Sequence, residues 1–191
     1  MTDTLTLLKT RRSIPAVNIV EPGPSPAEID DLLTIAARVP DHGKLVPFRF
    51  VLFEGAARAA AGAATAELLK AKKPDADPKQ LAAELNRFTR SPLVVAVVSR
   101  AAPHAKIPEW EQVLAAAASA MNLMIAANAM GYATQWLTEW VTYDADARAV
   151  LGLSPEERLV GLVHVGTPDI PPFERPRPDL AEIVTRWTPP A

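Results

Sequence analysis

The chain has no cysteine among its 191 residues. This absence excludes a disulfide scaffold, a cysteine-ligated zinc or iron–sulfur site and a cysteine nucleophile. The sequence also lacks the motifs Gly-x-Ser-x-Gly, Gly-x-Gly-x-x-Gly and Gly-Lys-Ser/Thr, which argues against a serine hydrolase, a Rossmann dinucleotide site and a P-loop. Chemistry in this protein therefore has to come from oxygen and nitrogen groups or from a bound cofactor.

Histidines are few, and their spacing does not suit a metal ion. His42, His104 and His164 lie about sixty residues apart and form no closely spaced pair of ligands. We therefore expect no metal site. Because His164 lies between Val163 and Val165, we expect it to be a packed or surface histidine in preference to a catalytic one.

Neither sign of charge is in large excess. Lys and Arg number 20 against 22 Asp and Glu, a formal net charge of -2, and the two signs are interspersed along the chain. This balance predicts neither a broad basic face for nucleic acid nor a polybasic patch for a membrane. The N-terminus lacks the basic region and apolar stretch of a secretory signal, so we expect a cytoplasmic protein that acts on small molecules.

Aromatic residues make up only 6% of the chain, and much of its 49% hydrophobic fraction is alanine. Alanine favours helix but buries little surface, so the core of one chain is thin for its length and we expect a homodimer. Proline is abundant, with 19 residues, about twice the roughly 5% of average proteins. The hydrophobic fraction nevertheless excludes a disordered proline-rich chain. We expect one domain over residues 1–191 with a proline-rich tail over residues 168–191.

Local patterns predict a mixture of helices and strands. Ser25 as N-cap, Pro26 at the first position and Glu28 three residues after the cap predict a helix that Pro40 ends. Further helices are predicted near Leu5 and over residues 56–71, 79–90 and 144–151, and strands over residues 48–53, 93–99, 132–138 and 159–166. The mixed order of these elements favours an α+β fold around one central sheet over a doubly wound fold.

The longest predicted helix begins with Pro108 at its first position and ends just before Gly131. No residue from Gln112 to Gly131 is charged, so a membrane span is an alternative. The predominance of alanine, the polar Asn122 and Asn128 and the lack of flanking positive charges favour a helix buried in the core or in a dimer interface instead.

Cations gather near predicted turns at both ends of the chain. Arg11-Arg12-Ser13 closes the first predicted helix, Arg38 precedes Pro40-Asp41-His42-Gly43-Lys44, and Arg175-Pro176-Arg177 lies in the tail. Guanidinium groups bind phosphate through paired hydrogen bonds, and hydroxyl and imidazole groups add shorter contacts. The alternatives are an ordinary basic helix terminus at the first segment and a solvated tail at the last.

Taken together and in order, these segments are similar to one family. Arg11-Arg12-Ser13 after a short first helix resembles the opening Arg-Arg-Ser motif of the nitroreductases, which bind flavin mononucleotide (FMN) and form intertwined homodimers. The segment from Arg38 to Lys44, followed by Pro47-Phe48-Arg49-Phe50, resembles the loop and strand start of a compact bacterial subgroup in which Pro-Asp-His replaces Pro-Ser and an asparagine. The likeness also covers the segments Ile107 to Gln112, Gly131 to Trp136 and Gly161 to Pro168, and runs from about residue 5 to residue 186.

The resemblance implies a nitroreductase-like fold, with a central mixed or antiparallel sheet flanked by helices, and a set of binding residues. Arg11, Arg12 and Ser13 would contact the flavin, and Arg38 and His42 would reach it from a matching loop in a site shared between subunits. Other implied flavin contacts are Trp136, Leu137 and Thr138 along the ring and Arg175 and Arg177 at the phosphate. The segment implied for the nicotinamide nucleotide comprises Ala126, Ala127, Asn128, Ala129, Met130 and Gly131.

Three positions depart from the family pattern. Val46 stands where glutamine is common, Phe48 stands where the family has tryptophan, and Leu137 replaces a polar or basic residue. These departures affect the expected substrate preference more than flavin binding. For Trp136, an aromatic side chain packed in the core is an equally good reading of the sequence without the resemblance.

The function implied is that of an FMN-dependent NAD(P)H oxidoreductase that reduces nitroaromatic, quinone or similar flat acceptors by a ping-pong route. Flavin N5 accepts the hydride, so no catalytic side chain is expected, although a nearby Arg11 or Arg12 would stabilise negative charge around N1 and O2. Alternatives on the same scaffold are a flavin-fragmenting enzyme and a dehalogenating enzyme. The non-enzymatic alternative is a flavin carrier or sensor without turnover.

Overall fold

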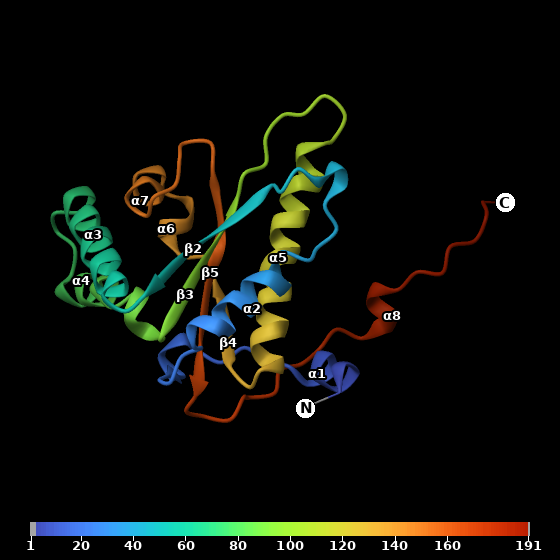
Figure 1. The fold of residues 1–191 in the computed structure, drawn as a ribbon, viewed down its shortest axis with the longest axis horizontal. Helices are drawn as coiled ribbons and strands as arrows, with labels where there is room; N and C mark the ends of the chain where they lie inside the picture. Colours follow the sequence, from blue (N-terminus) through green and yellow to red (C-terminus); the bar gives the residue numbers. More distant parts are fainter. Residues whose placement is uncertain (1–2, 191) are drawn as a thin grey trace.

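A computed structural model describes residues 3–190 and contains one five-stranded antiparallel sheet (Figure 1). The strands run in the order β2, β3, β5, and β5 also pairs with β1 and with β4. Their bounds are β1 Ile19–Val20, β2 Phe48–Glu54, β3 Leu93–Ser99, β4 Ala133–Leu137 and β5 Arg158–Pro168. The predicted α+β class with one central sheet is confirmed.

Strand β3 lies between β2 and β5 and is buried along its whole length. Its sequence is almost entirely valine and leucine because both of its faces contact the core. Val95 and Val97 pack with one core cluster, and Val94 and Val98 pack with the other. The predicted strand over residues 93–99 has the observed bounds.

Two helices, α2 (Pro26–Ala36) and α5 (Glu109–Ala129), cover one face of the sheet (Figure 1). The predicted capping box is present, because Ser25 N donates to Glu28 Oε2 at 2.8 Å and Glu28 N donates to Ser25 Oγ at 3.4 Å. Helix α5 is long and apolar enough to span a membrane, but half of its most apolar window is buried inside the protein. Its burial against β3 and β5 agrees with the preferred prediction of a core helix.

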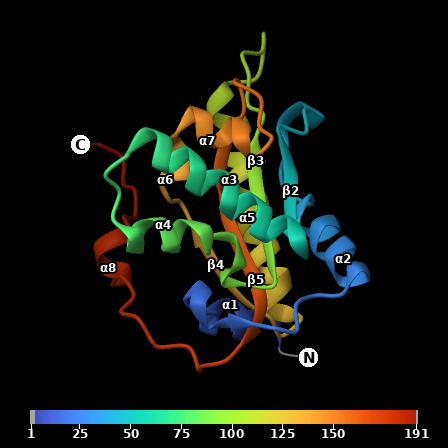
Figure 2. The same ribbon diagram turned by 90° about the vertical axis from the view of Figure 1, so that its left-hand side faces the viewer.

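The opposite face carries α3 (Ala56–Lys72), α6 (Trp140–Tyr143) and α7 (Ala145–Val150), with α4 (Pro78–Leu85) packed on α3 (Figure 2). The core on this side includes Phe53 and Phe88, whose ring centroids are 4.7 Å apart. Helices α3 and α4 approach closely at Gly62, where an added Cβ would overlap the backbone carbonyl of Leu85.

Two predicted boundaries are wrong, and two short elements were missed. The helix predicted over residues 79–90 ends at Leu85, and a 3₁₀ turn (η3, Phe88–Arg90) follows because Phe88 turns into the core. Pro108 is the N-cap of α5 and does not occupy its first helical position. Strand β1 and helix α6 were not predicted at all.

The N-terminal segment and the start of the C-terminal tail lie near each other beside β4 and β5. Helix α1 (Thr4–Thr10) packs against α5. At the other end, Ile170 packs on a small cluster formed by Ile14, Ile19 and Ala133. Beyond it, residues 171–190 are exposed, include α8 (Leu180–Ile183), and extend away from the sheet and its helices (Figure 1).

Candidate functional site

Four arginines from the two ends of the chain line one cavity of about 560 Å³, which we call the arginine cavity. The structure thereby brings together five of the residues predicted to bind the cofactor. The lining residues are Arg11, Arg12, Ser13, Pro15, Gln135, Arg175, Pro176, Arg177 and Pro178.

The residues on the N-terminal side of this cavity, Arg11 to Ser13, come directly after α1 in the chain. Arg11 is the C-cap, and its backbone N–H donates to Leu7 O at 2.8 Å. The chain then becomes extended, and Ile14 N donates to Thr134 O in β4 at 3.2 Å. The helix end and the sheet edge thus fix Arg11, Arg12 and Ser13 between them.

The tail is held over the cavity by Arg12. Its Nε donates to Phe173 O at 2.9 Å and lies 3.7 Å from Glu174 Oε1. The Arg12 side chain is only 13% exposed, so it is not an ordinary solvated helix end. Arg175 and Arg177 follow directly and line the same cavity.

Among the four arginines of this cavity, Arg11 has a buried side-chain donor without an acceptor in the described part of the chain. Its Nε is buried and has no hydrogen-bond acceptor among residues 3–190. Burial lowers the pKa of the Arg11 guanidinium, and the positive charges of Arg177 and Arg12 lower it further. Because an unpaired buried donor and clustered like charges both cost free energy, a phosphate dianion in the cavity would relieve both penalties.

Arg38 and His42 lie elsewhere in the same chain. His42 Nδ1 is 2.7 Å from Glu111 Oε2, and both residues line a separate cavity of about 280 Å³ over the start of α5. The backbone carbonyl of Arg38 accepts a hydrogen bond from Asn122 Nδ2 at 2.8 Å. One chain therefore does not bring Arg38 or His42 to the arginine cavity, and their predicted contact with a flavin in that cavity is not made within a single chain.

Strand β4 contributes to both the core and the arginine cavity, because alternate side chains face opposite sides of a strand. Gln135 lines the arginine cavity, and Leu137 points to the same side. Trp136 packs against the core with Val160, and its Nε1 donates to Val160 O at 3.2 Å. Thr138 is exposed just after the strand ends.

The segment predicted for the nicotinamide nucleotide is only partly accessible. Ala126 and Ala127 are buried in the core, at 5% and 0% exposure, and offer a ligand almost no surface. Asn128 Nδ2 donates to Tyr132 O at 2.9 Å and so supports the turn after α5. Of the six predicted residues, only Ala129, Met130 and Gly131 are exposed.

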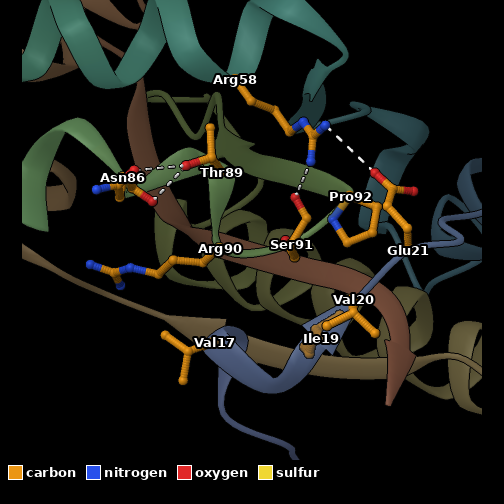
Figure 3. Close-up of a pocket in the computed structure, with 10 residues that line it drawn as sticks. All are labelled: Val17, Ile19, Val20, Glu21, Arg58, Asn86, Thr89, Arg90, Ser91 and Pro92. Atoms are coloured by element: carbon orange, nitrogen blue, oxygen red, sulfur yellow. Dashed lines mark hydrogen bonds and ion pairs between the residues drawn. The ribbon is translucent and has the colours of Figure 1, made fainter. Parts of the chain in front are cut away.

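A different cavity, of about 490 Å³, lies between β1, the start of α3 and the chain before β3 (Figure 3). Its polar groups are already paired with one another. Arg58 donates to Ser91 O at 2.7 Å and lies 3.6 Å from Glu21, while Thr89 donates to Asn86 O at 3.2 Å. This pairing leaves few donors for a ligand, so the arginine cavity is the better candidate.

Sequence reasoning missed a buried cluster of charges formed by Glu84, Arg87, Arg90 and Glu139. The spacing of Glu84 and Arg87 on one helical face was the only signal for it. His164 lies nearby, fully buried, with Nδ1 at 2.9 Å from Ser91 Oγ. Burial, and then the charge of Arg90, lowers the pKa of His164 to about 4. Of the two predicted alternatives, a packed or a surface histidine, the structure shows the packed one.

Comparison with known proteins agrees with this architecture. The Nitroreductase family matches residues 8–167. A relative named "Putative NAD(P)H nitroreductase YdjA" from Escherichia coli strain K12 is 30% identical over 168 residues, which are 88% of this chain and 90% of that protein.

Solved structures give the same fold. A nitroreductase-like family protein from Bacillus cereus superposes with a TM-score of 0.82 at 24% identity, covering 98% of this chain and 97% of the other. A variant of the FMN- and NADPH-dependent nitroreductase NfnB from Sphigopyxis sp. strain HMH superposes with a TM-score of 0.75 at 18% identity, covering 97% and 99%. From the family match and the extent of the identity to its relative, the chain belongs to the Nitroreductase family.

Proposed function

We propose that this protein is an FMN-dependent NAD(P)H oxidoreductase that reduces nitroaromatic compounds, quinones or similar flat acceptors. The observation that carries this proposal is the buried, unpaired Arg11 Nε in a cavity lined by three more arginines. Family membership gives the same reaction class, since the E. coli relative bears the name of an NAD(P)H nitroreductase.

The arginine cavity fits the FMN phosphate. Arg11, Arg12, Arg175 and Arg177 offer guanidinium donors, which bind a phosphate dianion through strong, charge-assisted hydrogen bonds. Gln135 lies on the same strand as Trp136 and Leu137, so a flavin held by its phosphate here would have its ring beside β4. When bound, FMN supplies the redox step, because flavin accepts hydride and passes electrons to an acceptor.

The protein's own groups have two tasks in this proposal. Three of the four arginines neutralise the phosphate, and the fourth, either Arg11 or Arg12, stabilises negative charge on the pyrimidine side of the ring more strongly in the reduced state than in the oxidised state. The exposed Ala129, Met130 and Gly131 remain the accessible part of the segment predicted to contact NAD(P)H.

The proposed active form is a homodimer located in the cytoplasm, each chain forming one flavin-binding domain. Arg38 and His42 of one subunit would complete the flavin site of its partner. The exposed tail supports this arrangement, since Phe173, Leu180 and Trp187 are all at least 70% exposed in a single chain. Large apolar side chains left in water favour a covering partner.

The visible spectrum of the purified protein, before and after anaerobic addition of NAD(P)H, tests the proposal. Flavin absorbance that bleaches with NAD(P)H and returns with a nitroaromatic compound or a quinone is the expected result. A yellow protein that NAD(P)H leaves oxidised would indicate a carrier or sensor. A colourless protein that does not bind added FMN would overturn both readings.

A further inference from the structure

Two consecutive residues just after β4 are anchored to a distant segment by buried and partly buried charges. Glu139 accepts hydrogen bonds from Arg90 Nη1 at 3.0 and 3.2 Å and forms an ion pair with Arg87. Trp140 Nε1 donates to Glu84 Oε2 at 2.7 Å. Both anchors come from residues 84–90, which run from the end of α4 to the end of η3.

The charges in this cluster are closely paired, and two of its four side chains are buried. Arg87 Nε donates to Glu84 Oε1 at 2.7 Å, and Glu84 and Arg87 are only 2% and 6% exposed. Burial alone would raise the pKa of Glu139, but Arg87 and Arg90 lower it below its usual range. Both carboxylates therefore stay charged at neutral pH, and each has arginine donors.

The cluster begins where the sheet stops. Leu137, the last residue of β4, pairs with Leu162 of β5, and Thr138 lies beyond this ladder. Backbone hydrogen bonds of the sheet therefore do not set the path of residues 138–140. The hydrogen bonds of Glu139 and Trp140 to residues 84–90 set it, together with the first turn of α6, in which Thr142 N donates to Glu139 O at 2.9 Å.

We propose that Glu139 is a positioning residue for the flavin site, which it serves by fixing the end of β4 and by balancing the charge of Arg87 and Arg90. The inference rests on the proposed function, in which the flavin ring lies beside β4. Glu139 is not a catalytic residue, because it acts through the segment that precedes it.

The negative charge of Glu139 allows its positioning role to be measured through the flavin potential. Glu84 and Glu139 together balance Arg87 and Arg90, so replacing Glu139 by glutamine leaves one uncompensated positive charge beside Thr138. Reduction adds negative charge to a flavin, and a nearby positive charge favours the reduced state. A purely structural defect would weaken binding of both redox states without this bias.

The test compares Glu139→Gln with Glu157→Gln in the full-length chain. Glu157 is a buried carboxylate just before β5, and it accepts from Arg49 Nε at 2.6 Å. Both variants lose one carboxylate that pairs with arginine, but only Glu139 is next to the residues expected to line the flavin. Dissociation constants for oxidised FMN, the midpoint potential and thermal unfolding are measured for both and for the unmodified chain.

For Glu139→Gln we expect about a tenfold weaker binding of oxidised FMN. We also expect the ratio of the oxidised to the reduced dissociation constant to rise about tenfold, which is about 30 mV in the potential of a two-electron couple. Glu157→Gln is expected to lose thermal stability while keeping the FMN affinity and potential of the unmodified chain. Glu139→Gln with unchanged FMN affinity and potential overturns the inference, as does a shift of equal size in Glu157→Gln. If the unmodified chain binds no FMN, the proposed function itself is wrong.

Discussion

Arg11 and Arg177, from opposite ends of the chain, face the same cavity, and after the effect of burial the charge of Arg177 lowers the pKa of the Arg11 guanidinium. Two like charges are held together only where the fold offsets their repulsion or where a counter-charge joins them. The pair therefore gives the most direct test of the phosphate site.

Replacing Arg11 or Arg177 by alanine should weaken FMN binding about tenfold to a hundredfold. This range corresponds to the roughly 1.5–3 kcal/mol of a hydrogen bond to a charged group. Fluorescence titration of apoprotein with FMN measures the loss. Arg158→Ala, which removes an arginine whose side chain is 69% exposed near Glu109, is the control and should bind FMN normally. If all of these variants bind FMN with the affinity of the unmodified chain, the FMN phosphate does not bind in the arginine cavity.

Ending the chain after Pro172 should weaken both the dimer and FMN binding. The truncation keeps Ile170, which packs against Ile14 and Ile19, but removes the Phe173 carbonyl that accepts from Arg12 and also removes Arg175 and Arg177. We expect at least about a tenfold rise in the FMN dissociation constant. Sedimentation velocity and FMN titration measure the two effects, and a far-UV spectrum checks that the fold persists. A truncated dimer that retains FMN would show that the tail has neither role.

Gly161→Ala should displace the Trp136 indole. An added Cβ would overlap Trp136 Nε1, lie 2.5 Å from its Cδ1 and lie 3.0 Å from Leu137 O. Overpacking of this kind costs about 1–3 kcal/mol, measurable by urea unfolding, and the tryptophan emission should shift. A second change, Trp136→Leu, removes the indole and should recover part of the stability. If FMN affinity falls in Gly161→Ala as well, Trp136 helps to line the flavin as well as the core.

The stability of the protein should fall as the pH is lowered from 6.5 to 5. His164 has a pKa of about 4 in the folded chain, below its reference value of 6.5. Between these values the unfolded chain binds more protons than the folded one, so the free energy of unfolding decreases with decreasing pH, by about 2 kcal/mol over this interval. Glu157, with its pKa lowered to about 2, loses its contribution only below about pH 4.5.

Urea unfolding of His164→Asn across the same interval isolates this effect. The variant should lose most of the pH dependence between 6.5 and 5. His104→Asn, which changes an exposed histidine, should keep the full dependence. If His164→Asn and the unmodified chain show the same change in the free energy of unfolding with pH, His164 is protonated in the folded state as readily as in the unfolded chain.

The sequence was sufficient to predict the helices and strands that depend on a local pattern of residues. Strand β3 was predicted with its observed bounds because a continuous apolar run is typical of a strand buried on both faces. Trp140-Val141-Thr142-Tyr143 is made of strand formers, yet it forms α6, because burial of Val141 and Thr142 outweighs local propensity. Strand β1 has two residues, Ile19 and Val20, and no pattern of that length has a period.

Some residues of the candidate site could be predicted from the sequence, and others could not. Arg11, Arg12, Arg175 and Arg177 could be named in advance from the family resemblance, but their meeting in one cavity depends on the path of the tail. Glu139 could not be named, because its partners Arg87 and Arg90 come from a segment about fifty residues earlier, beyond any local pairing rule. The burial of Ala126 and Ala127 could not be predicted either, because the sequence of a helix that is apolar on all sides does not indicate which residues face the core.

Strand β5 pairs with β1, β3 and β4, although it spans residues 158–168 of a chain of 191. During synthesis, β2 and β3 can pair early through the connection formed by α3 and α4, but one edge of the apolar β3 has no partner until more than four-fifths of the chain has left the ribosome. Long-range pairing of this kind folds slowly and leaves aggregation-prone edges open in the nascent chain. We therefore expect yield in the cell to depend on chaperones that shield β3, and to fall with mutations in β5 before folded-state stability does.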